Sequence, residues 1–301
     1  MTRYLGELTH QEIENALRTD GLGLDVFGFR CLVTSNTGLL TSPLHFLYPR
    51  YPAEIIPNGF FDFHIALNEN RHFLGKKTVH FLWEDKSPFP DLPLDQAHAL
   101  FEWGLNWCIA TASGSDIVIH AAVVERDGAA LVLPGEPGSG KSTFCADLVF
   151  KGWRLLSDEL TIIDPKTGLV RPFPRPISLK NSSIDIVAER HPAAPMSGRI
   201  TDTRKGDIAY IRPPDSAVDS AEAVKISRVI FPKYIAHAEL ELTPLTKAFG
   251  FSRLLENTFN LDLLNKQGFA QYADSISDAD FFDLSYSDLD QVHHCLAELC
   301  K

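Results

Sequence analysis

The chain has 301 residues, of which 45% are hydrophobic and 22% are charged, a composition typical of globular proteins with enough apolar material for one large domain or two. Its formal net charge of -11 argues against binding to nucleic acids and to anionic membrane surfaces, because both present negative phosphates. Five scattered cysteines without a C-x-x-C pair argue against a disulfide framework and a zinc knuckle. We expect a cytoplasmic protein, since no signal segment and no bilayer-length apolar run is present.

Residues 1–95 are predicted to form an N-terminal α+β region. The sequence LTHQEIENAL predicts a short helix, with Thr9 as the N-cap and Glu12 three residues later. From Gly21 to Trp83, short apolar runs such as FGFRCLV and FDFHIAL alternate with turn sequences, a pattern typical of a small, mostly β region. The Pro-rich stretch SPFPDLPLD indicates a linker at 87–95.

Residues 96–245 are predicted to form the core domain. QAHALFEWGLNWCIATA carries apolar residues at helical spacing and predicts a helix that enters this domain. Two apolar runs, 117–124 and 129–133, flank Asp127-Gly128, which is a strong signal for a β-hairpin. Farther along, STFCADLVFKG predicts a helix, and WRLLSDELTIIDPKTGLVRPF predicts two strands around a Pro-Lys-Thr-Gly turn.

The segment 171–212 is Pro-rich, and we expect it to be irregular. It holds eight basic residues against four acidic ones, a local positive excess in an acidic chain. The tail 246–301 is predicted to be a mainly helical extension that packs on the core, with AFGFSRLLENTFNLDLLNKQGF as its clearest piece.

A phosphate-binding motif lies between an apolar strand, ALVLP, and a predicted helix. GEPGSGKST matches G-x-x-x-x-G-K-[ST] in full. Glycines let successive backbone N–H groups point into one concavity, the lysine places a charge on the β/γ oxygens, and the Ser hydroxyl binds Mg²⁺. The predicted ATP-binding residues are Gly135, Glu136, Pro137, Gly138, Ser139, Gly140, Lys141, Ser142 and Thr143.

Acidic residues follow this motif after one predicted helix. Asp158 and Glu159 stand where a carboxylate is needed for Mg²⁺ and where a base is needed for an acceptor hydroxyl. In an unbroken strand their side chains would point to opposite faces, so serving one site requires a turn between them. His120 lies on the neighbouring hairpin strand, and Lys180 in PRPISLKN is a candidate for contacting phosphate.

From His120 to Glu159 the chain resembles the HPr kinase/phosphorylase superfamily, through IHAAVVERDGAALVLPGEPGSGKSTFCADLVFKGWRLLSDEL. It is most similar to the HPr-kinase-related kinases of group A, with EWGLNWCIA, HAAVVERDG, GWRLLSDEL, PFPRPISLKN, FPKY and LSYSDLD. This resemblance covers most of the chain from Asp62 onward. It implies an α/β fold with a P-loop kinase core of the phosphoenolpyruvate-carboxykinase-like type, built on a mixed sheet.

The resemblance also implies roles for individual residues. ATP is the implied donor, Asp158 the base, and Glu159 a support for Mg²⁺ together with Ser142 and Asp158. His120 would lie near the transferred phosphate. The segment PRPISLKN lacks the metal-binding acid of HPr kinases, so Lys180 is expected to contact phosphate instead. Residues 1–105 do not resemble the HPr kinase N-terminal domain, so HPr is not the expected acceptor.

The first functional hypothesis is therefore an ATP-dependent kinase that acts on a Ser/Thr hydroxyl of a peptide or protein. The group that the chain resembles is associated with PqqD-like peptide-binding proteins, which makes such a protein a candidate partner. A small-molecule kinase on the same scaffold is one alternative. Another is a nucleotide-gated binding module in which ATP orders 171–212 and hydrolysis is incidental. The acceptor remains open, and so does the oligomeric state, for which a homo-oligomer is one option.

Overall fold

A computed structural model describes residues 3–71, 76–84, 86–112, 114 and 116–299. The chain forms two compact units, one from Met1–Ala112 with Pro195–Asp219 and the other from Ser113–Ala194 with Ser220–Lys301. This division differs from the predicted ranges 1–95, 96–245 and 246–301. The helix after the Pro-rich stretch and the segment 195–219 belong to the first unit, because their contacts lie there.

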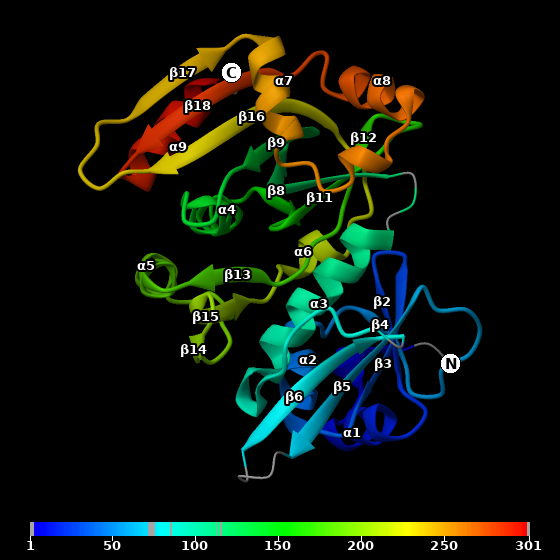
Figure 1. The fold of residues 1–301 in the computed structure, drawn as a ribbon. Helices are drawn as coiled ribbons and strands as arrows, with labels where there is room; N and C mark the ends of the chain where they lie inside the picture. The colour runs from blue at the N-terminus through cyan, green and yellow to red at the C-terminus, as the bar shows by residue number, and fades with distance from the viewer. Residues whose placement is uncertain (1–2, 72–75, 85, 113, 115, 300–301) are drawn as a thin grey trace. The chain divides into compact units, whose positions relative to one another are not determined.

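The first unit holds a seven-stranded sheet with three helices of more than one turn and several short ones (Figure 1). Its elements are β1 (Arg3–Tyr4), η1 (Leu5–Glu7), α1 (His10–Arg18), β2 (Leu22–Val26), β3 (Phe29–Ser35), η2 (Gly38–Leu40), α2 (Thr41–Leu47), β4 (Pro52–Glu54), β5 (Phe63–Arg71), β6 (Lys77–Trp83), β7 (Leu92–Pro93), η3 (Leu94–Gln96), α3 (Ala97–Ala112), β14 (Ile200–Thr203), β15 (Gly206–Ile211) and α6 (Asp215–Val218). The order in the sheet is β1-β4-β2-β3-β5-β6-β7.

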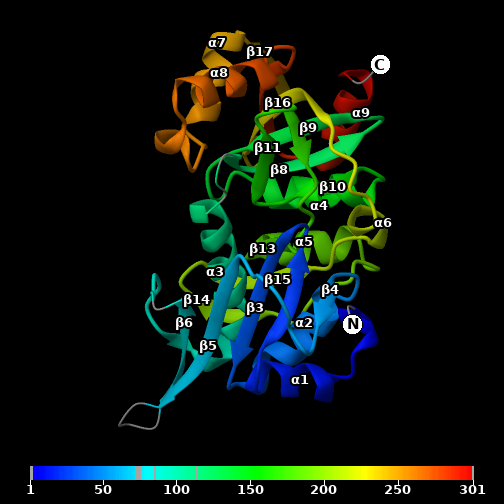
Figure 2. The same cartoon turned by 90° about the vertical axis from the view of Figure 1, so that its right-hand side faces the viewer.

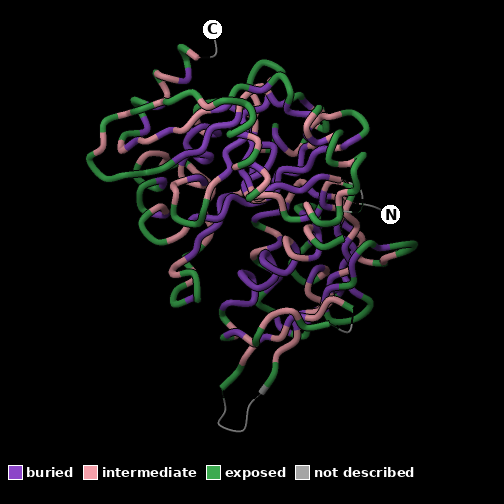
Figure 3. The backbone as a smooth tube through the Cα atoms, turned by 45° about the horizontal axis from the view of Figure 1, so that its top comes forward, coloured by how far each residue is buried: buried purple, intermediate pink, exposed green. Residues whose placement is uncertain are grey.

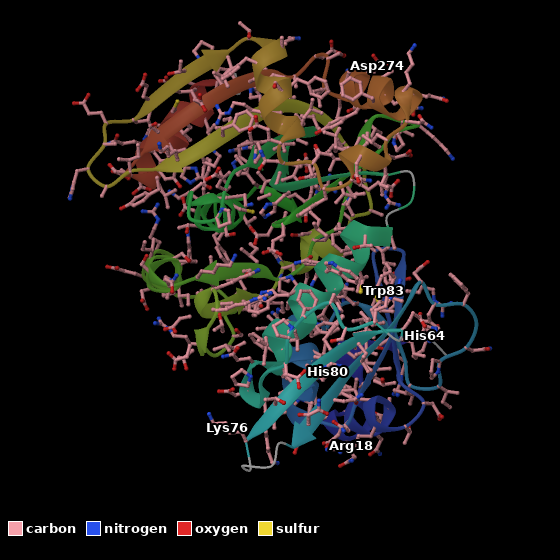
Figure 4. The ribbon with its side chains drawn as sticks, viewed as in Figure 1. Arg18, His64, Lys76, His80, Trp83 and Asp274 are labelled. Atoms are coloured by element: carbon pink, nitrogen blue, oxygen red, sulfur yellow. The ribbon has the colours of Figure 1, made fainter. Side chains whose placement is uncertain are left out.

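Local sequence signals explain much of this unit. Thr9 caps α1 by accepting from the N–H of Glu12, whose side chain accepts in return from the N–H of Thr9, so the predicted capping box is confirmed. Helix α3 packs so closely on β6 that a Cβ at Gly104 would lie 1.9 Å from the ring of Phe81. Trp83, labelled in Figure 4, lies on the same strand. Its ring packs against that of Trp107 of α3, with centroids 5.1 Å apart.

The second unit holds an eight-stranded sheet with helices on both faces. Its elements are β8 (Ile117–Arg126), β9 (Ala129–Pro134), α4 (Lys141–Phe150), β10 (Arg154–Ser157), β11 (Leu160–Asp164), β12 (Leu169–Arg171), β13 (Ile177–Lys180), α5 (Ser182–Arg190), β16 (Lys225–Tyr234), β17 (Glu241–Leu245), α7 (Lys247–Leu255), η4 (Leu261–Leu263), α8 (Lys266–Ser275), β18 (Asp280–Tyr286) and α9 (Leu289–Leu299).

The sheet of the second unit is mixed, as predicted. Its order is β12-β11-β8-β9-β16-β18-β17, and β10 pairs with β8. Strands β9, β16 and β18 run parallel, whereas β8, β11, β12 and β17 pair antiparallel with their neighbours. The predicted hairpin of β8 and β9 is confirmed, with Asp127 and Gly128 at φ angles of 55° and 78°, both in the left-handed region that this turn requires.

Helix α4 lies on one face of this sheet, and α7 and α8 lie on the other (Figures 1 and 2). The second face carries a core in which Ile119, Val132 and Val229 pack with Leu254 of α7 and Tyr272 of α8. Buried residues, purple in Figure 3, run through the inner segments of the backbone. Residues 233–237, at the end of β16 and just beyond it, are exposed. Strand β9 is buried from its second residue to its last, so the loop between β9 and α4 starts from a buried strand.

Three expectations are corrected by the structure. The tail 246–301 is not only a helical extension, because β18 inserts into the sheet between β16 and β17. The segment 171–212 is not irregular throughout, since β13 and α5 form within it. WRLLSDELTII does not make one strand, because β10 and β11 are separated at Asp158 and Glu159.

None of the described helices combines the length and apolar character that crossing a membrane requires.

Candidate functional site

The loop 135–140 joins the end of β9 to the start of α4. Gly138 and Gly140 have φ angles of 90° and 89°, which residues with a Cβ rarely adopt. Helix α4 begins at Lys141, and the first-turn amides of any α-helix have no acceptor within the helix. The turn therefore presents N–H groups and the positive end of the helix dipole to an anion.

The other residues of the predicted motif lie in this loop or directly beside it. Glu136 and Pro137 are exposed, and the N–H of Ser139 donates to the carbonyl oxygen of Glu136 at 3.2 Å, which closes the loop on itself. Gly135 is half-buried, and a Cβ there would lie 2.7 Å from Oγ of Ser139. Thr143 is half-buried in the first turn of α4.

Lys141 is buried with its ammonium next to His120 of β8. Its Nζ lies 3.1 Å from Nε2 of His120 and donates to the carbonyl oxygen of Gly135 at 3.3 Å. An ammonium can only donate, so Nε2 of His120 accepts and the ring proton is assigned to Nδ1. Burial lowers the pKa of Lys141, and the charges of Asp158 and Glu159 oppose that shift. An anion bound beside Lys141 would favour its charged form.

Asp158 lies between β10 and β11, with only 2% of its surface exposed. One carboxylate oxygen, Oδ2, accepts from Oγ of Ser142 at 3.2 Å and from the N–H of Ser178 at 3.0 Å. The other oxygen, Oδ1, is buried and has no hydrogen-bond partner within the described part of the chain. Burial, together with the charge of Glu159, raises the pKa of Asp158 to about 6. Such a carboxylate is charged at neutral pH and still basic enough to accept a proton.

Glu159 and Lys180 form the outer part of the site. Nζ of Lys180, at the end of β13, lies 3.9 Å from Oε1 of Glu159. Both side chains are partly exposed, so this pair contributes little to stability by itself. The break between β10 and β11 falls at Asp158 and Glu159, and it provides the interruption that two adjacent carboxylates need in order to serve one site.

The residues fit a nucleoside triphosphate with Mg²⁺. Oδ1 of Asp158 is a buried oxygen without a partner among the described residues, and Oγ of Ser142 lies beside the same carboxylate. Mg²⁺ prefers oxygen ligands and usually takes one or two carboxylates together with phosphate oxygens. The described residues contain no cluster of three or more His, Cys, Asp or Glu side chains arranged for a metal. A carboxylate beside a hydroxyl suits a metal that arrives with the phosphates.

Residues 257–259, which no sequence motif linked to the site, lie beside His120. The N–H of His120 donates to the carbonyl oxygen of Asn257 at 2.7 Å, and the N–H of Phe259 donates to Val118 at 2.9 Å. The ring of Phe259 is half exposed, and its centroid lies 5.4 Å from that of His120. These hydrogen bonds lie at the start of β8, before the stretch 121–126 that pairs with β9. No local motif predicts this pairing between segments far apart in sequence.

Helix α4 is tied to two neighbouring helices through Asp147, whose carboxylate is fully buried. It accepts from Nε of Arg190 at 3.0 Å and pairs with Nε2 of His191 and of His293, each at 2.6 Å. Burial alone would raise the pKa of Asp147, but these hydrogen bonds hold it well below its ordinary value. The cluster fixes the helix that carries Lys141 and Ser142 against α5 and α9.

No protein-family model matches the chain, and no curated protein matches it. Among solved structures, it is similar to the HPr(Ser) kinase/phosphatase from Coxiella burnetii, with 13% sequence identity over 60% of this chain and 98% of that chain. The TM-score is 0.27, which is too low to support an assignment of function. The function proposed below therefore rests on the residues of the site.

Proposed function

We propose that this protein is an ATP-dependent kinase that transfers the γ-phosphoryl group to a Ser or Thr hydroxyl of a peptide or protein. The observation that carries the proposal is the pair of contacts at the start of α4. Lys141 lies against His120, and Ser142 donates to Asp158. A cation, a hydroxyl and a buried carboxylate thus meet at one helix N-terminus. Phosphoryl transfer depends mainly on this kind of positioning and charge stabilisation.

Binding of ATP is assigned to the loop 135–140 and the first turn of α4. Their N–H groups would hold the phosphates, and Lys141 would add a full charge to the β/γ oxygens. Ser142 and Glu159, with Oδ2 of Asp158, would hold Mg²⁺, and Oδ1 of Asp158 stays free for the acceptor hydroxyl. When bound, Mg²⁺ neutralises charge on the β- and γ-phosphate oxygens. Ser142 would turn its hydroxyl from Asp158 toward the metal.

Transfer requires a base for the acceptor hydroxyl, and Asp158 is the candidate. Its Oδ1 would take the hydroxyl proton as the acceptor oxygen bonds to the γ-phosphorus. At the same time, the bond from that phosphorus to the bridging oxygen breaks, and the electron pair leaves with ADP. The hydrogen bond from the N–H of Ser178 to Oδ2 keeps the carboxylate oriented during this step.

His120 and Lys180 have supporting roles in this proposal. His120 holds the ammonium of Lys141 through Nε2, and its ring also contacts the ring of Phe259. Lys180 is placed near Glu159, so it would add positive charge close to the transferred group.

The acceptor is proposed from the resemblance of the motifs to the HPr-kinase-related kinases. It is a peptide or protein, with a PqqD-like peptide-binding protein as a candidate partner, and the reaction is placed in the cytoplasm. The test is to incubate the protein with labelled ATP and a soluble extract, and to identify the phosphorylated species by mass spectrometry. Lys141→Ala should abolish the label.

Other results of that experiment would assign a different function. A label on a metabolite alone would indicate a small-molecule kinase. Release of free phosphate, with no labelled acceptor in the extract, would indicate a nucleotide-gated module. No turnover of ATP by the wild-type protein would contradict the kinase proposal.

A further inference from the structure

The residue that ends β16 lies directly against the phosphate-binding loop. Strands β9 and β16 are parallel, so their carboxyl ends reach the same edge of the sheet. At that edge the N–H of Tyr234 donates to the carbonyl oxygen of Ser139 at 3.0 Å. A Cβ at Gly140 would lie 3.1 Å from the Cβ of Tyr234. Tyr234 is thus held next to the loop by its backbone, and its Cβ lies beside Gly140.

Tyr234 flanks the loop on the side away from the catalytic carboxylate. In the sheet, β9 lies between β8 and β16. Asp158 follows β10, which pairs with β8, whereas Tyr234 ends β16. A triphosphate whose γ-phosphorus lies near Asp158 and Lys141 therefore extends across the loop. Its nucleoside would then lie on the β16 side of the loop.

The side chain of Tyr234 is exposed, and its ring packs against the buried ring of Tyr286. It is 48% exposed, and its ring centroid lies 5.9 Å from that of Tyr286, which is 2% exposed. The next residue, Ile235, is 40% exposed, and its N–H donates to the carbonyl oxygen of Tyr286 at 2.9 Å. An aromatic ring and an aliphatic side chain are thus presented to solvent on a backbone that is held by hydrogen bonds.

From this arrangement we propose that Tyr234, with Ile235 beside it, forms the surface on which the base of the bound nucleoside triphosphate stacks. This inference rests on the proposed function, because it requires the triphosphate to occupy the loop. Stacking on an aromatic ring tolerates different bases, since every base has a π-face. The surface therefore supplies affinity for a nucleoside rather than a strict choice of base.

The test compares ATP with inorganic tripolyphosphate, which has the phosphates but no base. Affinities are measured by calorimetry in the presence of Mg²⁺ for wild type, Tyr234→Ala and Tyr234→Phe. Tyr234→Ala should weaken ATP binding about tenfold, as the loss of one base–aromatic stack does. Its affinity for tripolyphosphate should stay unchanged, and Tyr234→Phe should bind ATP like wild type. Phe249→Ala is the matched control, because Phe249 is 54% exposed on α7 and should leave both affinities unchanged.

Two results would overturn the inference while leaving the kinase proposal in place. One is wild-type affinity of Tyr234→Ala for ATP. The other is an equal loss of ATP and tripolyphosphate binding, which would mean that the substitution disturbs the loop. If wild type bound neither ligand, the proposed function itself would fail, and the inference with it.

Discussion

Nζ of Lys141 lies 3.1 Å from Nε2 of His120, so a histidine from the hairpin strand orients the lysine that follows the glycine-rich loop. The lysine is only 7% exposed, and it has lost most of the water that would surround an ammonium in solution. A cation held in place before the ligand arrives needs little rearrangement when charge develops on the transferred group. Lys141 therefore supplies the positive charge of the candidate site, and His120 holds it in place.

Replacing this cation should weaken nucleotide binding strongly. Lys141→Met keeps the length of the side chain and removes its charge, so the fold should persist. We expect affinity for ATP to fall by about 10–100-fold, which corresponds to the loss of a hydrogen bond to a charged group. Calorimetric titration with ATP measures the effect, and Lys151→Met, at the other end of α4, is the matched control. Equal affinities of Lys141→Met and wild type would remove Lys141 from the binding site.

Asp158 should affect the chemical step much more than binding. Asp158→Asn keeps the shape of the side chain and an oxygen for the N–H of Ser178, but it cannot take a proton. We expect transfer to fall by about 10²–10⁴-fold, the usual contribution of a general base, with little change in ATP affinity. Single-turnover transfer from labelled ATP gives the rate. Wild-type transfer by Asp158→Asn would show that another group accepts the proton.

The same substitution should stabilise the folded protein at neutral pH. The pKa of Asp158 is raised from 3.8 to about 6, so between these values the folded state binds more protons than the unfolded state. Stability contributed by this group is therefore lost as the pH rises through that window. Asp158→Asn should raise the free energy of unfolding by on the order of 1–3 kcal/mol at pH 7.5, and by much less at pH 4. Urea denaturation at both pH values checks this, and a gain that did not depend on pH would contradict it.

Local signals were sufficient to predict the parts of the fold that depend on neighbouring residues. Asp127 and Gly128 predicted the turn of the β8–β9 hairpin because both adopt left-handed φ angles there. Thr9 and Glu12 predicted the start of α1 because their hydrogen bonds are local. The loop between β9 and α4 could be identified because glycines, lysine and serine are needed at fixed offsets in one short stretch.

Contacts between distant segments could not be predicted in this way. Strand β18 was assigned to a helical tail, because FFDLSY becomes recognisable as a strand only when its neighbours β16 and β17 are known. The partners of His120 in the segment 257–259 are likewise distant in sequence. Tyr234 lies in FPKY, one of the stretches that carry the resemblance, but its place beside the loop follows from the parallel pairing of β9 and β16.

Removing the carboxylate of Asp147 should destabilise the second unit. Asp147→Ala would leave Arg190, His191 and His293 around a buried site without their shared acceptor, and breaking a buried pair costs about 3–5 kcal/mol. Chemical denaturation measures the loss. Asp290→Ala is the control, because Asp290 also pairs with Arg190 but is exposed, and it should change stability much less. Similar losses of stability in both variants would show that the buried position of Asp147 does not strengthen its contribution to stability.

Two glycines of the loop should respond differently to the same substitution. Gly138 and Gly140 have nearly equal positive φ angles, so alanine at either position carries a comparable backbone strain of about 1–3 kcal/mol. A Cβ at Gly138 meets nothing within 4 Å, whereas one at Gly140 would lie 2.6 Å from Oη of Tyr286. Gly140→Ala must therefore also displace the loop or the end of β18. We expect it to lower the melting temperature more than Gly138→Ala and to reduce ATP affinity further. Equal effects of the two substitutions in both measurements would mean that strain alone matters and that the close approach of Tyr286 does not.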